Sequence, residues 1–130
     1  MSAVTDAIDL FRSEWAKRFV DDCEVTRYDL TNPTFNEDTG KTEYPESTPY
    51  SGGCLARPAS ALEVEYGLDR RQEVDYDLYL PHDAAELKEG DEVAVDSERD
   101  PDIPTLTVLR PFGDSYLTRR HYETKAVTDD

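Results

Sequence analysis

Apolar side chains recur at every second residue from Val74 to Leu80, and this spacing limits the possible folds more than any other feature. Successive side chains of a β-strand point to opposite faces, so the spacing predicts a strand with one apolar and one polar face. Pro81 ends the strand, because proline cannot donate a ladder hydrogen bond. We expect a core face of Val74, Tyr76, Leu78 and Leu80, and a face toward solvent or a partner of Asp75, Asp77 and Tyr79.

The chain then returns across the same core. Gly90-Asp91 is a turn dipeptide, and Glu92 to Asp96 resumes the alternation with Val93 and Val95 inward. Five or six short strands predict a mainly β protein, a small antiparallel β-barrel or sandwich with one N-terminal helix and long loops. The other predicted strands are Cys23 to Tyr28, Tyr50 to Pro58, Thr105 to Arg110 and Tyr116 to Val127, the last of them on a sheet edge.

The N-terminal residues follow a helical pattern instead. Apolar residues fall three or four positions apart, which predicts an amphipathic helix within residues 2–20. We expect Ile8, Phe11 and Trp15 to pack against the barrel or against a neighbouring copy. The apolar positions are Val4, Ala7, Ile8, Phe11, Trp15 and Phe19.

A chain of 130 residues fits one domain, with the helix at 2–20 and the barrel at 23–127. A long segment at 31–49 is rich in turn formers and predicts a loop or an open hairpin, after which regular pairing resumes at Tyr50. The segment from Ala59 to Leu68 fits either one turn of helix or an irregular loop.

The charge excludes one large class of function. The chain has 30 acidic and 14 basic side chains, a net charge of -16, and binding to phosphates requires clustered Lys and Arg. A free-standing nucleic-acid-binding protein is therefore not expected. The first residues lack the basic-then-apolar order of a signal peptide, and no apolar run approaches the roughly 20 residues that span a bilayer. We expect a soluble, non-secreted protein with no membrane partner.

The titratable residues do not form a catalytic pattern. His82 and His121 are separated along the chain, and each is expected to be an ordinary surface histidine. Cys23 and Cys54 lack zinc-site spacing and are expected to be buried free thiols. No phosphate-binding glycine motif is present. The sequence therefore predicts no enzyme activity, no catalytic residue, no cofactor and no metal.

Aromatic and basic residues provide candidates for contact with a partner. Phe35, Tyr44 and Tyr50 lie in or beside the long segment, where they either fold back over the barrel or contact another protein. Arg119 and Arg120 form the densest basic site, which is either a solvated edge or an ion-pair contact to an acidic neighbouring copy.

The order of these features resembles a known family. The helix is followed by Cys23-Glu24-Val25, Asp38-Thr39-Gly40, Tyr50 to Ala56, Tyr76 to Pro81, Leu87 to Val93 and the strand with Arg119-Arg120. In this order, over most of the chain, the sequence resembles the head-closure, or head-to-tail stopper, proteins of long-tailed double-stranded DNA bacteriophages.

The resemblance implies a structural virion protein in the phage neck, at the head-tail junction. There it would form a ring of six or twelve copies, with the portal adaptor above and a tail terminator or tail tube below. Such a ring closes the portal channel after DNA packaging, opens at genome ejection and provides the platform for the tail. Before assembly the protein would be in the host cytoplasm.

Within this interpretation, packaged DNA is a steric contact only. We expect the channel to be closed by the tip of the long segment, which is extended and has little apolar content to hold it down. The candidate residues are Asn36, Glu37, Asp38, Thr39, Gly40, Lys41 and Thr42.

Two alternatives remain open from the sequence. The first is another neck or tail component, such as a tail terminator. The second is a cytoplasmic β-barrel adaptor that binds a peptide at an exposed edge strand, which would be a monomer without affinity for capsids.

Overall fold

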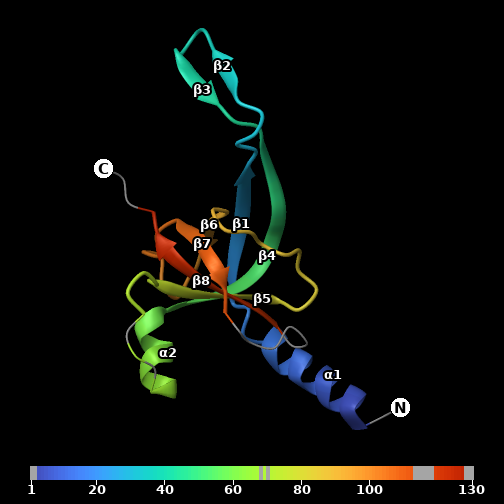
Figure 1. Cartoon of the computed structure of the whole chain (residues 1–130). Helices are drawn as coiled ribbons and strands as arrows, with labels where there is room; N and C mark the ends of the chain where they lie inside the picture. The colour runs from blue at the N-terminus through green and yellow to red at the C-terminus, as the bar shows by residue number, and fades with distance from the viewer. Residues whose placement is uncertain (1–2, 68, 70, 113–118, 128–130) are drawn as a thin grey trace.

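Six strands of the computed structural model close into an antiparallel barrel (Figure 1). The structure describes residues 3–67, 69, 71–112 and 119–127. The prediction of a mainly β protein with a small barrel and an N-terminal helix is confirmed. Around the barrel the order is β1 (Asp21–Tyr28), β4 (Glu46–Pro58), β5 (Tyr76–Pro81), β8 (Arg119–Ala126), β7 (Leu106–Pro111) and β6 (Glu92–Asp96), which pairs again with β1.

The barrel interior is filled by the apolar side chains that the alternation placed there. Leu78 and Leu80 on β5 and Val93 on β6 are completely buried, as predicted. Burial of an aliphatic side chain of this size contributes about 1.5–3 kcal/mol. The remaining members of the core are Cys23, Val25, Cys54, Ala56, Ala84, Leu87, Ile103, Leu106, Val108 and Tyr122.

The last strand is not on a sheet edge, so that prediction is wrong. β8 pairs with β5 through Tyr79 and His121, and with β7 through Thr107 and Lys125. Barrel closure causes this difference, since it gives every strand two neighbours. β8 begins at Arg119, and the start expected at Tyr116 lies outside the described residues.

The outer face of β5 also differs from the prediction. Asp75 is exposed, but Asp77 and Tyr79 are only 0% and 3% exposed rather than directed to solvent or a partner. Side chains from the segment before β5 and from β8 cover this face, as described below.

The ambiguous segment after β4 forms a helix, α2 (Ala59–Tyr66). It begins after Pro58 and ends at Gly67, whose φ of 63° is the left-handed conformation that glycine adopts readily. Ala59 and Leu62 are buried, whereas Val64 and Tyr66 are exposed. One side of α2 therefore packs on the barrel and the other side is free.

Two elements project from the barrel in different directions (Figure 1). Helix α1 (Ala3–Ala16) projects from one end. At the other end the strands β2 (Thr34–Asn36) and β3 (Lys41–Glu43) form a hairpin beyond the barrel, and we call residues 29–45 the arm. The predicted open hairpin is present, but pairing resumes at Glu46 rather than at Tyr50, since β1 continues far enough to pair Tyr28 with Glu46.

The two cysteines are free and buried, as predicted. Their side chains lie in the barrel core, with 5% of Cys23 and none of Cys54 exposed. A hydrogen bond with Cys23, followed by burial, raises the pKa of the Cys54 thiol. The raised pKa keeps the Cys54 thiol protonated, and burial makes both thiols inaccessible.

We therefore expect iodoacetamide to leave both cysteines of the folded protein unmodified at pH 8 and to modify both in guanidinium chloride. Mass spectrometry of the intact chain would measure this. Labelling of the folded protein at the rate of an unstructured cysteine peptide would contradict the prediction.

Candidate interaction surfaces and a buried ion cluster

The tip of the arm is a turn closed by its own side chains. The amide N of Asp38 donates to Asn36 Oδ1 at 2.9 Å, and the amide N of Gly40 donates to the Asn36 carbonyl oxygen at 2.8 Å. Gly40 has a φ of 68°, which other L-residues rarely adopt. The candidate channel-closing residues 36–42 thus form a defined hairpin tip.

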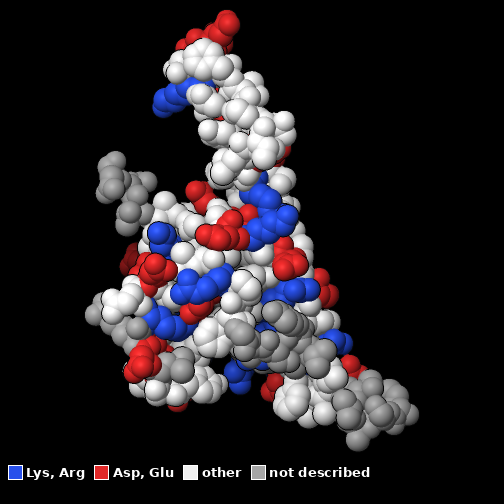
Figure 2. Space-filling model, in the orientation of Figure 1, with Lys and Arg blue, Asp and Glu red and all other residues white. Residues whose placement is uncertain are grey.

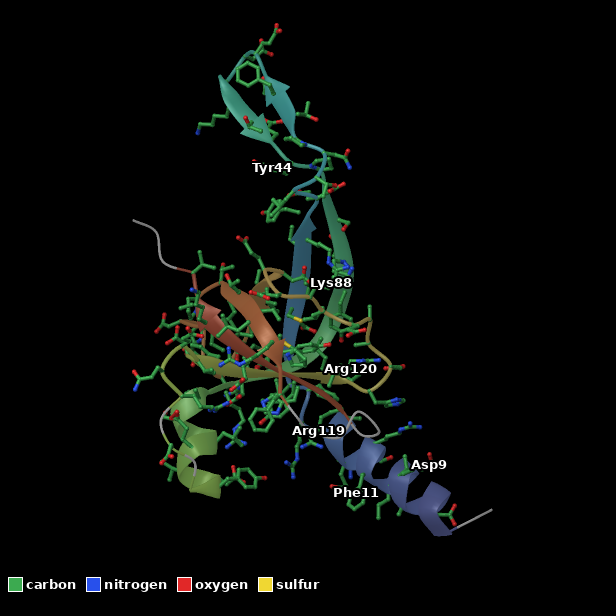
Figure 3. The ribbon with its side chains drawn as sticks, in the orientation of Figure 1. Asp9, Phe11, Tyr44, Lys88, Arg119 and Arg120 are labelled. Atoms are coloured by element: carbon green, nitrogen blue, oxygen red, sulfur yellow. The ribbon has the colours of Figure 1, made fainter. Side chains whose placement is uncertain are left out.

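The aromatic side chains of the arm point away from the barrel core. Phe35 is 62% exposed and Tyr44, which Figure 3 labels, is 41% exposed, so these two do not fold back over the barrel. Tyr50 behaves differently, because it packs against the core and its hydroxyl donates to the Gly53 carbonyl oxygen at 2.6 Å. Burial and the nearby thiols raise the pKa of Tyr50 to about 12. Tyr50 therefore packs on the barrel, and its role in contact with a partner stays a prediction.

The apolar side of α1 is largely uncovered. Phe11 and Leu10 are 55% and 59% exposed, and Ile8 is half-buried (Figure 3). The prediction that Phe11 packs on the barrel is therefore wrong. The alternative, that it packs on a neighbouring copy, stays a prediction. The Trp15 side chain lies outside the described residues. Phe19, which follows α1 in the chain, lies close to Gly53 of β4.

Arg119 and Arg120 begin β8, opposite Pro81 and Leu80 of β5, and both are half-buried. They lie at the end of the barrel from which α1 leaves (Figure 3). They are not on a sheet edge as expected, because β8 is an interior strand of the closed barrel.

A buried ion cluster covers the outer face of β5 and β8. Asp77 and Glu123 lie directly opposite each other in the strand register. Two adjacent carboxylates repel each other, and Arg71 relieves this by donating to both, at 2.7 Å to Asp77 Oδ2 and 2.9 Å to Glu123 Oε2. Arg110 Nε adds a hydrogen bond of 2.7 Å to Glu123 Oε1.

His121 completes the ion cluster, and its burial corrects another prediction. It is 3% exposed rather than a surface histidine, and its Nε2 lies 2.9 Å from Asp77 Oδ1. The rings of Tyr79 and Phe112 stack on it with centroid distances of 4.2 Å and 4.4 Å.

The ion cluster joins the segment that contains Arg71 to strands β5 and β8. The side chains of Arg71, Asp77 and Glu123 are only 13%, 0% and 8% exposed, so the ion cluster is largely shielded from water. Arg71 also donates to the carbonyl oxygen of Ala59, so the cluster holds the start of α2 against the barrel. Sequence reasoning missed the cluster, although the alternation of His121 and Glu123 along β8 was a visible signal for a second polar face.

The charge of Asp77 depends on its partners. Burial alone would raise the pKa of Asp77, but hydrogen bonds from Arg71 and His121 outweigh it and lower the pKa below its ordinary value. A carboxyl with a lowered folded-state pKa stabilises the fold above its unfolded pKa of about 4, and this stabilisation is lost as the pH falls through the folded-state pKa.

We expect Asp77→Asn to be less stable than the wild type at pH 7, and to lose less stability than the wild type below about pH 4. Urea unfolding at pH 7 and at pH 3 would measure both effects. Asp83→Asn at an exposed position is the control, and it should follow the wild type. Equal losses for Asp77→Asn and the wild type between the two pH values would contradict the prediction.

No cluster of three or more His, Cys, Asp or Glu side chains in the described part of the chain has the arrangement of a metal site. Among the same residues, no helix combines the length and apolar content that crossing a bilayer requires.

Comparison with known proteins identifies a family for this chain. A family model described as "Family of unknown function (DUF6093)" matches residues 11–125, which include the second part of α1, the arm and the barrel strands up to the penultimate residue of β8. No curated protein and no solved structure matches. Since the matched region covers most of the 130 residues, the chain belongs to the DUF6093 family.

Proposed function

We propose that this protein forms a ring in the neck of a long-tailed double-stranded DNA bacteriophage, where it closes the portal channel after packaging and provides the platform for the tail. The observation that carries the proposal is the combination of a closed barrel with two exposed projections, α1 and the arm (Figure 1). The order of sequence motifs described above supports the same role.

Ring formation requires two different surfaces on each subunit, because a head-to-tail contact repeats around the ring. The closed barrel offers no unpaired strand among its described residues, so copies cannot join by extending the barrel sheet. Contacts between subunits would then be formed by side chains on the two projections. Phe11 on α1 and Phe35 on the arm are exposed aromatic residues of the kind that interfaces bury.

The arm supplies a structure that could block a channel. Its tip is a compact turn far from the barrel, with acidic atoms at its end (Figure 2). Glu37 and Asp38 would repel phosphates, so DNA would be stopped by steric contact without adhering. The DNA could then pass when the channel opens.

The alternatives differ in what they need from the molecule. A tail terminator would also form a ring, and only its position in the particle separates it from a stopper. A peptide-binding adaptor needs a free strand edge, and in the described residues the barrel has none. The short strands β2 and β3 of the arm keep an unpaired edge each, but they span only three residues.

Removal of the gene from the genome that carries it tests the proposal. We expect tailless heads that package DNA and then lose it, as seen by electron microscopy and a DNA-content assay, with rescue by the wild-type gene supplied in trans. Heads that keep their DNA but carry tails of abnormal length would favour a tail terminator. Normal particles with retained DNA would exclude a neck role.

A further inference from the structure

The outer face of β1 and β6 carries an unusual arrangement of like charges. Asp22 on β1 lies directly opposite Asp96 on β6, and Glu24 lies opposite Ala94. Carboxylates opposite each other on neighbouring strands destabilise a sheet. Unlike Asp77 and Glu123, the three carboxylates of Asp22, Glu24 and Asp96 have no ion pair with any cation that the structure describes. We call this surface the acidic face.

The acidic face is also hollowed. The hollow is shallow and open, has a volume of about 330 Å³, and is lined by the three carboxylates together with the small side chains of Ser51 and Ala94. A shallow surface with this lining would admit a side chain that combines apolar and cationic character.

Helix α1 has the complementary properties. Its carboxyl half and the following turn, from Phe11 to Arg18, carry three cations and one carboxylate, a net charge of +2 within a chain of net charge -16. Leu10 and Phe11, which precede Arg12 directly in the chain, have exposed side chains. The charged residues are Arg12, Glu14, Lys17 and Arg18.

The helix of one copy does not cover the acidic face of the same copy. It projects away from the barrel, and its Phe11 is 55% exposed (Figures 1 and 3). Its 14 residues extend about 20 Å, which is far enough to reach an adjacent subunit.

We propose that α1 of one copy docks on the acidic face of the next copy, with its cations beside Asp22, Glu24 and Asp96. This inference deepens the proposed function and rests on it for the ring. The contact joins two different surfaces, so each copy gives one helix and receives one. The incoming cations neutralise the opposed carboxylates, and Leu10 and Phe11 leave water.

Charge reversal on either surface tests the contact. Variant one carries Arg12→Glu and Lys17→Glu, and variant two carries Glu24→Lys and Asp96→Lys. In each variant alone, α1 and the acidic face carry net charges of the same sign. Self-association should therefore be at least about tenfold weaker than in the wild type. In an equimolar mixture every helix finds a face of opposite sign, and association should return. Sedimentation velocity at low salt measures it, and circular dichroism checks folding.

A matched control reverses two carboxylates elsewhere. Glu86→Lys with Glu89→Lys changes the net charge as variant two does, at exposed positions in the loop before β6, and should associate like the wild type. A second measurement, independent of reversed charges, mixes Arg12→Cys with Glu24→Cys copies and adds a bifunctional thiol reagent. Cross-linked pairs of one copy of each kind are expected, since the native thiols are buried.

The outcomes separate this inference from the proposed function. If the gene is needed for DNA retention but the mixture neither restores association nor cross-links, the contact is wrong and the neck role stands. If removal of the gene leaves normal particles while the mixture associates, the contact stands and the neck role is wrong. A wild type that does not self-associate at about millimolar concentration and low salt also overturns the contact.

Discussion

Replacement of Arg71 by methionine is expected to lower the free energy of unfolding by about 3–5 kcal/mol at pH 7. Arg71 binds two carboxylates that lie opposite each other, and neither Asp77, with 0% of its side chain exposed, nor Glu123, with 8%, can be hydrated in its place. Hydrogen bonds to Asp77 raise the pKa of Arg71, so the wild-type side chain is charged throughout the accessible pH range. Urea unfolding followed by circular dichroism would measure the loss.

Two further variants show whether the charge or the bulk of Arg71 is responsible. Arg57 forms a more exposed pair with Glu65 at 3.3 Å, so Arg57→Met should change stability by about 0.5 kcal/mol or less. Adding Asp77→Asn and Glu123→Gln to Arg71→Met removes the uncompensated charges and should recover part of the loss. If the free energy of unfolding of Arg71→Met falls by less than about 1 kcal/mol, the prediction is contradicted, because water must then replace the guanidinium.

The ion cluster also illustrates what a strand pattern can predict. The alternation from Val74 to Leu80 correctly placed Leu78 and Leu80 in the core, because side-chain direction is a local property. Whether the opposite face is covered is not local. Asp77 is buried by Arg71 from the preceding segment and by His121 from a strand far along the chain. An alternation of apolar and polar residues in one strand cannot predict these contacts with other segments.

The same distinction explains the errors in strand pairing. β1 and β6 close the barrel by pairing Val25 with Val93, residues that are distant in the sequence. Nothing in the sequence of β8 indicates that it has two neighbours. Pro49 suggested that β4 starts only at Tyr50, yet it lies where the register between β1 and β4 is irregular, and proline is tolerated at such irregularities.

For the candidate contact residues, the sequence indicated the segments but not the direction of each side chain. Phe35 and Tyr50 are both aromatic and both near the turn-rich segment, but Phe35 is exposed on the arm and Tyr50 packs on the core. The difference arises because Tyr50 lies where β4 is part of the barrel. The charge opposition of Asp22 and Asp96 likewise appears only when β1 and β6 are paired.

Shortening the arm is expected to produce the second large effect, the loss of packaged DNA from otherwise complete heads. Replacing residues 36–42 by two glycines removes the tip, which lies beyond the barrel and contributes no side chain to its core. The barrel should therefore keep its stability in urea, and the protein should still join particles. If the tip closes the channel by its bulk, DNA content per head should fall to the level found when the gene is absent.

A control with the tip's bulk retained separates steric from electrostatic closure. Glu37→Ser with Asp38→Ser keeps the turn, because the hydrogen bonds that close it are accepted by Asn36 and the left-handed residue is Gly40. A steric tip predicts that this variant retains DNA, whereas closure by phosphate repulsion predicts leakage from it as well. If heads with the shortened arm retain their DNA, the arm does not close the channel, and its exposed Phe35 would then serve in contact with another subunit.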